Sequence, residues 1–164
     1  SYMCGANRPG HFSGVFRIVK LLFEIIEPNY AYFGKKDFQQ LLLVKYIAST
    51  YFPKLKIIDV DTVRDSNNIA LSSRLSKVSC ESIHQVKLIF QTLMTMKKKL
   101  LSGLEYNAVK ESSLLDLEDN NISVEYLDLR RLDTLKEQVN INHPCGIFIA
   151  CYIDNIRLID NIEI

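Results

Sequence analysis

Three short clusters in the first half of the chain contain residues whose types and spacing could act on a phosphorylated ligand. They are RPGHF (8–12), GKKDFQQ (34–40) and IALSSR (69–74). Glycine lets the backbone approach a ligand closely, lysine supplies a mobile charge, and serine and arginine supply hydroxyl and guanidinium donors. The second and third clusters together would suit a nucleotide triphosphate. Neither is a P-loop, because GxxxxGK[ST] does not occur in the chain.

The elements around these clusters predict a parallel α/β sheet. Apolar spacing indicates a helix from Val15, a buried strand over 30–34, a second helix capped by Asp37 and a second strand over 55–60. In an open parallel sheet, ligands bind where strands deliver their carboxyl ends to helix N-termini. The cluster 34–40 lies at such a place, where unpaired N–H groups could hold a phosphate.

The second half has a different pattern. Residues 61–80 form a polar loop, and helices are expected over 81–101 and 104–119. Apolar runs predict strands over 122–129, 146–153 and 156–159, the last two joined by a tight turn in an antiparallel sheet. We therefore expect an α/β part over residues 1–78 and a small α+β domain over residues 79–164.

Charge and hydropathy exclude two classes of partner. The 164 residues include 20 basic and 19 acidic side chains, a formal net charge of +1. We therefore expect no nucleic acid partner, and no apolar run approaches the roughly 20 residues that a membrane span needs. Residues 1–82 have a net charge of +4 and residues 83–164 a net charge of −3, so the first half suits an anionic ligand better.

The cysteines and histidines indicate neither a disulfide framework nor a metal centre. Cys4, Cys80, Cys145 and Cys151 contain no CxxC pair, and the three histidines lie far apart in the sequence. No targeting segment is evident. We expect reduced thiols, a cytoplasmic location and no protein-bound metal site.

Each candidate cluster also has an ordinary structural explanation. Gly34 often marks a simple turn, and the pair Lys35-Lys36 is typical of a solvated surface. Ser72-Ser73-Arg74 is compatible with ordinary loop polarity, Gln39-Gln40 with a helix surface, and His11 with a contact at a helix N-terminus. The occurrence of all these residues in one small unit, at places where α/β proteins bind ligands, favours a functional site.

The motifs RPGHFSGV (8–15), PNYAYFGKKDFQQL (28–41), TVRDSNNIALSSR (62–74) and RLIDN (157–161) resemble the pantothenate synthetase family, the ATP-dependent pantoate–β-alanine ligases. The resemblance is close over residues 5–74, looser over 75–145 and close again over 146–161. It implies a partial Rossmann-like sheet of the nucleotidyltransferase type, followed by a small domain with an antiparallel sheet.

The resemblance also implies a reaction in two steps. The pantoate carboxylate attacks the α-phosphate of ATP with Mg²⁺ assistance, which gives pantoyl adenylate and pyrophosphate. The amine of β-alanine then displaces AMP and forms pantothenate. The resemblance allows a homodimer in the full-length enzyme.

The family's site residues transfer to matching positions here. The ATP site would comprise Gly34, Lys35, Lys36, Asp37, Val63, Leu71, Ser72, Ser73 and Arg74. Lys36, Ser72 and Arg74 would be the catalytic residues, because they neutralise charge as the α-phosphorus becomes five-coordinate. Val63 would pack near the adenine, and Gln40 would hold pantoate through its amide. Arg8 and His11 match a family motif but receive no role.

The sequence departs from the family pattern at four places. Lys35 replaces a usual Glu, Asp61 stands where proline is frequent, Asn67-Asn68 replaces Asp-Gly, and Leu75 replaces Asn. The Lys35 change reverses a local charge, which would either strengthen phosphate attraction or alter the entry to the helix.

The family's N-terminal PTMG-x-LH-x-GH segment, whose histidines act on the α-phosphate, has no counterpart in this sequence, which begins at Ser1. We therefore expect a C-terminal fragment that is inactive alone, because an incomplete site positions its substrates poorly. One alternative is a standalone nucleotide-binding or regulatory module without catalysis. Another is a decayed remnant, which the intact Lys36, Gln40 and Ser72–Arg74 argue against.

Overall fold

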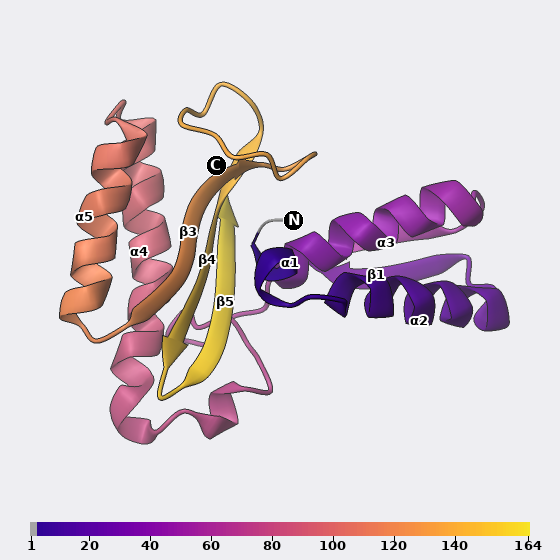
Figure 1. The fold of residues 1–164 in the computed structure, drawn as a ribbon, viewed down its shortest axis with the longest axis horizontal. Coiled ribbons are helices and arrows are strands. Elements are labelled where there is room, and N and C mark those ends of the chain that lie inside the picture. The colour runs from indigo at the N-terminus through magenta and orange to yellow at the C-terminus, as the bar shows by residue number, and fades with distance from the viewer. Residues whose placement is uncertain (1–2) are drawn as a thin grey trace. The chain divides into compact units, whose positions relative to one another are not determined.

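The computed structural model describes residues 3–164, and backbone contacts divide the chain after Thr62 into two compact units (Figure 1). The expected domain boundary lies later, after residue 78. Residues 63–78 belong to the second unit by contacts because Ile69 and Val78 are buried in its core. The division by domain stays a prediction, since the compact units are defined by contacts alone.

The first unit has the predicted order of helix, strand, helix and strand. Its elements are α1 (Cys4–Asn7), α2 (His11–Ile26), β1 (Tyr30–Gly34), the 3-10 turn η1 (Lys35–Asp37), α3 (Phe38–Tyr51) and β2 (Lys56–Val60). The two strands pair in parallel, with Tyr30 opposite Lys56 and Gly34 opposite Val60. This pairing places the carboxyl ends of both strands at the same edge.

Helix α2 begins four residues before the predicted Val15, at His11. Gly10 precedes it with a φ of 77°, a left-handed conformation that favours glycine. The RPGHF motif therefore forms the turn that starts α2 rather than a loop ahead of it.

The core of the first unit lies between α2, α3 and the sheet. It contains Phe23, Val44, Ile47, Ala48 and Leu55. The Phe23 ring meets the rings of both Phe33 and Phe52 edge-on, a favourable arrangement for aromatic pairs.

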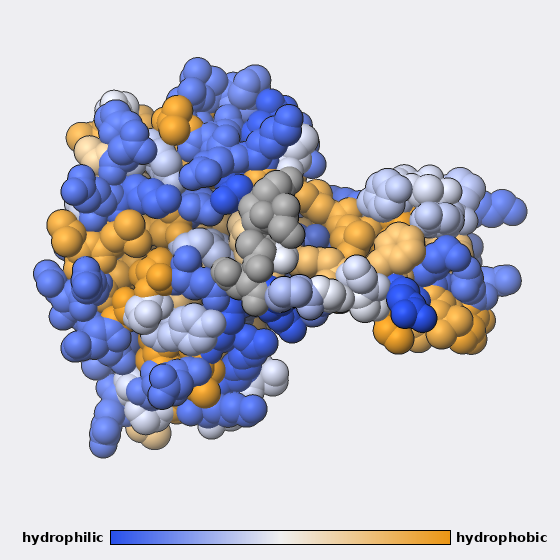
Figure 2. Space-filling model, in the orientation of Figure 1, coloured by the Kyte–Doolittle hydropathy of each residue, from blue (hydrophilic) through white to orange (hydrophobic). Residues whose placement is uncertain are grey.

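Helix α2 is apolar on a second side as well. Ile18, Leu22 and Ile26, which belong to the apolar helical pattern that begins at Val15, are 59%, 46% and 64% exposed. Leu21 and Ile25 lie at the surface with them, and Figure 2 shows apolar residues on the surface of this unit. The side of α2 that is buried is the one that carries Phe23.

The second unit is a three-stranded antiparallel sheet with two long helices. The polar loop leads through the 3-10 turns η2 (Leu75–Lys77) and η3 (Cys80–Ser82) to α4 (Ile83–Leu101) and α5 (Tyr106–Asp119). Strands β3 (Ser123–Arg131), β4 (Cys145–Ile153) and β5 (Ile156–Glu163) follow in that spatial order. Helices α4 and α5 pack against each other and against the sheet (Figure 1).

The predicted β4–β5 hairpin is confirmed, with β5 running past Ile159 to Glu163. Asp154 and Asn155 form its turn with φ values of 50° and 60°. Both residue types tolerate this left-handed conformation better than most, which explains why they occur here. The parallel and antiparallel sheets together give the predicted α/β fold class.

None of the helices in residues 3–164 combines the length and apolar character needed to cross a membrane. All four cysteines are free thiols, with Cys80 exposed and both Cys145 and Cys151 buried in the second unit. Burial raises the pKa of the Cys151 thiol to about 12 and also raises that of Cys145.

We expect Leu93→Ala to lower the free energy of unfolding by about 2–5 kcal/mol, because truncation of a fully buried leucine leaves a cavity. Leu93 is 0% exposed in α4. Leu101→Ala in the same helix is the matched control, since Leu101 is 58% exposed and should change stability by less than about 0.5 kcal/mol. Urea denaturation followed by circular dichroism measures both, and equal effects would contradict the described core.

We expect Cys80 to react rapidly with DTNB in the folded protein, and Cys145 and Cys151 to react only after unfolding. Reactivity requires an accessible thiolate, which burial denies to the two core cysteines. The rate of thiol modification with and without guanidinium tests this, with Cys80→Ser identifying the fast phase. A single common rate for all the thiols in the folded protein would contradict the burial of the two core residues.

Candidate functional site

The first group of candidate residues lies at the carboxyl end of β1. Gly34 has an extended backbone with φ −73°, and a Cβ added there would meet nothing within 4 Å. The backbone conformation at position 34 therefore does not require glycine. Because glycine has no side chain, the space at the end of the strand stays open. The chain then makes the η1 turn and enters α3 at Phe38.

Lys35 and Lys36 lie together in η1, and Lys35 forms an ion pair with the next strand's end. The Lys35 ammonium is 2.8 Å from the carboxylate of Asp61, the first residue after β2. Because β1 and β2 are parallel, these two residues meet at the shared edge of the sheet. The two departures at positions 35 and 61 thus form one ion pair, and the charge of Lys35 is directed to the end of β2.

Asp37 takes the predicted N-cap position of α3, but its side chain makes no capping hydrogen bond there. The position was predicted correctly and the capping interaction was not. The N–H groups of the first turn of a helix have no partner within the helix and carry its positive dipole end. The start of α3 therefore has the character of an anion-binding site, with Lys36 immediately before it.

Gln40 lies in the first turn of α3 and lines a pocket with residues from the start of α2. The pocket, called here the Gln40 pocket, is bordered by Gly10, His11, Gly14, Val15, Ile18, Val19 and Gln40. One amide and one imidazole thus face a mostly apolar surface. Such a mixture suits a small ligand that has both branched carbon and polar oxygen atoms.

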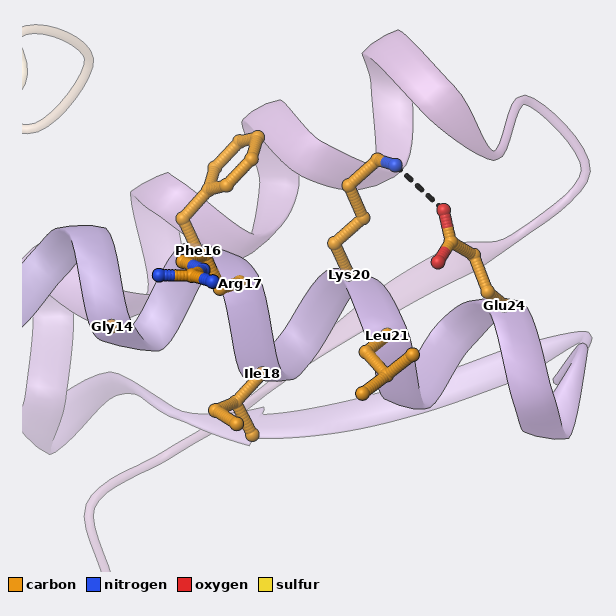
Figure 3. A pocket seen from close by; sticks show the side chains of 7 residues that line it. All are labelled: Gly14, Phe16, Arg17, Ile18, Lys20, Leu21 and Glu24. Carbon is orange, nitrogen blue, oxygen red and sulfur yellow. Dashed lines mark hydrogen bonds and ion pairs between the residues drawn. The ribbon is translucent and has the colours of Figure 1, made fainter.

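A second hollow lies on α2. Its side chains come from one helix, with Ile18 and Leu21 on the side opposite to Phe16 and Lys20 (Figure 3). The ammonium of Lys20 is 2.6 Å from Glu24, so the two groups neutralise each other. This hollow was not predicted and has no convergent set of polar groups.

The second group of candidate residues lies in the loop before α4, which belongs to the second unit. Leu71 donates its N–H to the carbonyl of Val63 at 2.9 Å, and Arg64 pairs with Ala70 in an isolated β-bridge. The loop is thus a small hairpin whose exposed side chains include Val63 and Leu71, 61% and 52% exposed.

The tip of this hairpin explains one departure from the family pattern. Asn68 has a φ of 63°, and asparagine is among the few residues that adopt this conformation in place of glycine. The carboxylate of Asp65 accepts the N–H groups of Asn67 and Ile69 at 2.8 and 2.9 Å, which closes the turn.

Ser72, Ser73 and Arg74 follow as one short stretch. The hydroxyl of Ser72 accepts the N–H of Arg74 at 3.2 Å, and the guanidinium of Arg74 donates to the carbonyl of Arg157 at 2.8 Å. Leu75 packs against the core of the second unit, so this departure fixes the end of the stretch by hydrophobic contact.

The structure brings the predicted residues together in two groups. Gly34–Gln40 share one strand end and helix start, and Val63 and Leu71–Arg74 share one loop; the groups belong to different compact units. Residues 3–164 contain no cluster of three or more His, Cys, Asp or Glu side chains that could hold a metal ion. Sequence reasoning missed the pairing of Asp61 with Lys35 and the contact of Arg74 with β5, because each joins residues that are distant in the chain.

A parallel sheet edge with cations, followed by a serine- and arginine-containing loop, defines a candidate anion-binding α/β protein. The sequence matches the pantoate–β-alanine ligase family over residues 1–163, and the chain belongs to that family. Sequence relatives include pantothenate synthetases of Leptospira interrogans (34% identity, 99% of this chain, 58% of the relative) and Shewanella baltica (36%, 98% and 57%).

Solved structures of the same family are also similar to this chain. The Thermus thermophilus pantothenate synthetase matches 98% of this chain with a TM-score of 0.91 and 31% identity, over 59% of its own length. The Francisella tularensis pantoate–β-alanine ligase, complexed with beta-gamma ATP and β-alanine, matches 99% of this chain with a TM-score of 0.76 and 30% identity, over 54% of its length. The chain thus spans less than two thirds of the length of these relatives.

Proposed function

We propose that this chain carries the ATP- and pantoate-binding elements of a ligase that condenses pantoate with β-alanine. The family match over residues 1–163 carries the proposal. It is supported by the Francisella tularensis relative, which was crystallised with beta-gamma ATP and β-alanine. In the proposed reaction the pantoate carboxylate attacks the α-phosphate, pyrophosphate leaves, and the β-alanine amine then displaces AMP from pantoyl adenylate.

Lys36 has the central role in the first step. Its ammonium and the N-terminus of α3 would take up negative charge from the triphosphate, and Gly34 and Asp37 would line the same strand end. Lys35 would line it too, but with its charge directed to Asp61. Lys36 stands at the position of the lysine that contacts the triphosphate in the family motif, so it is the cation of η1 that we assign to the phosphates.

The loop residues would stabilise the negative charge that develops on the phosphate oxygens during the reaction. Ser72 and Ser73 offer hydroxyl donors and Arg74 offers a planar fork that matches two phosphate oxygens at once. Leu71 and Val63 present exposed apolar side chains to which an adenine ring could bind.

The Gln40 pocket fits pantoate in its chemistry. Pantoate combines a carboxylate and two hydroxyls with a dimethyl carbon, so it needs both polar and apolar contacts. Gln40 would hold its oxygen atoms through the side-chain amide, and Val15 and Val19 would contact its methyl groups.

The remaining partners follow from the same reaction. Mg²⁺ would be held largely by the nucleotide phosphates, because it prefers oxygen ligands and substrate phosphates supply them. Its charge would help to neutralise the triphosphate. The free thiols fit a cytoplasmic enzyme, and a homodimer is the oligomer proposed for the full-length ligase.

We propose that this chain does not catalyse the reaction alone. It spans 58% of the Leptospira interrogans relative, and its two-stranded parallel sheet is smaller than most parallel sheets that bind ligands. The test is to fuse the unmatched N-terminal part of that relative to this chain and to measure pantothenate formation by both proteins. Activity of the fusion alone supports a ligase fragment, whereas ATP binding by an inactive fusion would favour a nucleotide-binding module.

We expect Lys36→Ala to lower the rate of pyrophosphate release in the completed ligase by at least about tenfold, because a cation that neutralises the transition state is lost. Lys35→Ala is the matched control in the same turn. It should change the rate less than about threefold, since an ion pair with a carboxylate as exposed as that of Asp61 contributes little. Unchanged adenylate formation by Lys36→Ala, with an unchanged circular dichroism spectrum, would contradict the role proposed for this lysine.

We expect Gln40→Leu to raise the KM for pantoate at least about tenfold and to leave the KM for ATP within about twofold, because a hydrogen-bonding amide is replaced by an apolar group of similar size. Gln85→Leu controls for the substitution itself, since Gln85 lies on α4 in the second unit. Steady-state kinetics with each substrate varied in turn makes the comparison. A selective rise in the KM for ATP would assign Gln40 to the nucleotide instead.

A further inference from the structure

The segment that carries Ser72–Arg74 is attached to the β4–β5 hairpin at two places within the second unit. Arg74 reaches the carbonyl of Arg157 on β5, and Ser79 and Ser82 reach the carboxylate of Asp154 at the hairpin turn. We propose that Asp154 is a positioning residue for the phosphate-binding loop Leu71–Arg74. This inference rests on the proposed function of that loop.

The contact at Asp154 uses both oxygens of the carboxylate. One accepts the backbone N–H of Ser79 at 2.9 Å, and the other accepts the hydroxyl of Ser82 at 2.9 Å. The Ser79 hydroxyl in turn accepts the N–H of Ser82 at 3.2 Å and caps η3. Asp154 therefore fixes the point where the loop turns into α4, although it lies 75 residues from Ser79 in the chain.

The ionised form of Asp154 is the form that this contact needs. A carboxylate can accept from two donors that approach from different directions, whereas a protonated acid or an amide offers fewer acceptor sites. The hydrogen bonds from Ser79 and Ser82 lower the pKa of Asp154. The carboxylate thus remains charged at any pH at which an ordinary aspartate is charged.

The second attachment places Arg74 on the same hairpin. The carbonyl that accepts its guanidinium belongs to Arg157, whose own side chain is held by both oxygens of Glu125 at 2.8 Å each. Between the two attachments, Val78 is buried and Leu75 packs on the core. The segment from Arg74 to Ser79 is therefore held at both ends, and it fixes the C-terminal end of the loop Leu71–Arg74.

A phosphate site needs this kind of support. Hydroxyl and guanidinium donors stabilise a reacting phosphate only when they are held in place before the ligand binds, since small displacements weaken catalysis greatly. Asp154 touches no proposed substrate atom and acts through Ser79 and Ser82. Its loss should therefore change ATP binding through the loop and not through the charge of the site.

The test compares Asp154→Asn with Asp119→Asn in the purified 164-residue chain. Asparagine adopts the left-handed conformation at position 154 readily, so the hairpin turn is kept. One carboxylate oxygen becomes an amide NH₂ group, which cannot accept a hydrogen bond from Ser79 or Ser82. Asp119→Asn removes one exposed carboxylate from the end of α5 and controls for net charge. Hydrogen–deuterium exchange of residues 71–82 without nucleotide measures the attachment, and calorimetric titration with ATP measures its consequence.

We expect Asp154→Asn to speed exchange over residues 71–82 and to weaken ATP binding by about tenfold, while Asp119→Asn changes neither. Ser82→Ala should weaken binding too, and its effect should not add to that of Asp154→Asn, since both remove the same contact. A double variant that loses the full sum of both effects would overturn the proposal.

Other outcomes separate this inference from the function on which it rests. Unchanged exchange in Asp154→Asn would overturn it, and so would faster exchange with unchanged ATP affinity. If neither the unmodified chain nor its fusion with the N-terminal part of the relative binds ATP while the loop is protected from exchange, the nucleotide role of the loop fails and the positioning role fails with it. Slow exchange that becomes fast only in Asp154→Asn would still establish the attachment itself.

Discussion

The candidate site of the first unit depends on a short parallel pairing between β1 and β2. The register sets Gly34 opposite Val60, so both strands end at one edge. This register brings together the residues that directly follow the two strands, namely Lys35, Lys36 and Asp61. A shift by one residue would turn each side chain to the other face and separate these groups.

In the second unit, the candidate residues are held in place by side-chain contacts to the antiparallel sheet. The guanidinium of Arg64 donates to both oxygens of Asp160 at 2.7 and 2.8 Å and lies 4.0 Å from the centre of the Phe90 ring. Buried ion pairs add little net stability, but an unpaired buried charge is costly, so such a pair strongly disfavours other loop positions. Arg64 and Arg74 thus tie the two ends of the hairpin loop to β5.

Local patterns made much of this structure predictable. The apolar run over 30–34, the helical spacing from Val15 and the tight turn between the last two strands all act within a few residues, and the strands and helices that they predicted are present. The exposed side of α2 could not be predicted, because helical spacing identifies an apolar face without showing what covers it. The contacts of Asp61, Asp160 and Asp154 escaped prediction for a related reason, since each depends on which distant segment the fold brings near.

The charge at position 35 shows how tertiary structure decides the meaning of a departure from a family pattern. The sequence alone allowed either stronger phosphate attraction or an altered helix entry. The 2.8 Å pair with Asp61 favours neither, because the added cation meets an anion at the end of the next strand. Two adjacent ammonium groups repel each other, and the pair with Asp61 reduces that repulsion because it neutralises the charge of Lys35. The reversed charge at position 35 and the acidic residue at position 61 therefore act as a single compensated change at the shared edge of the sheet.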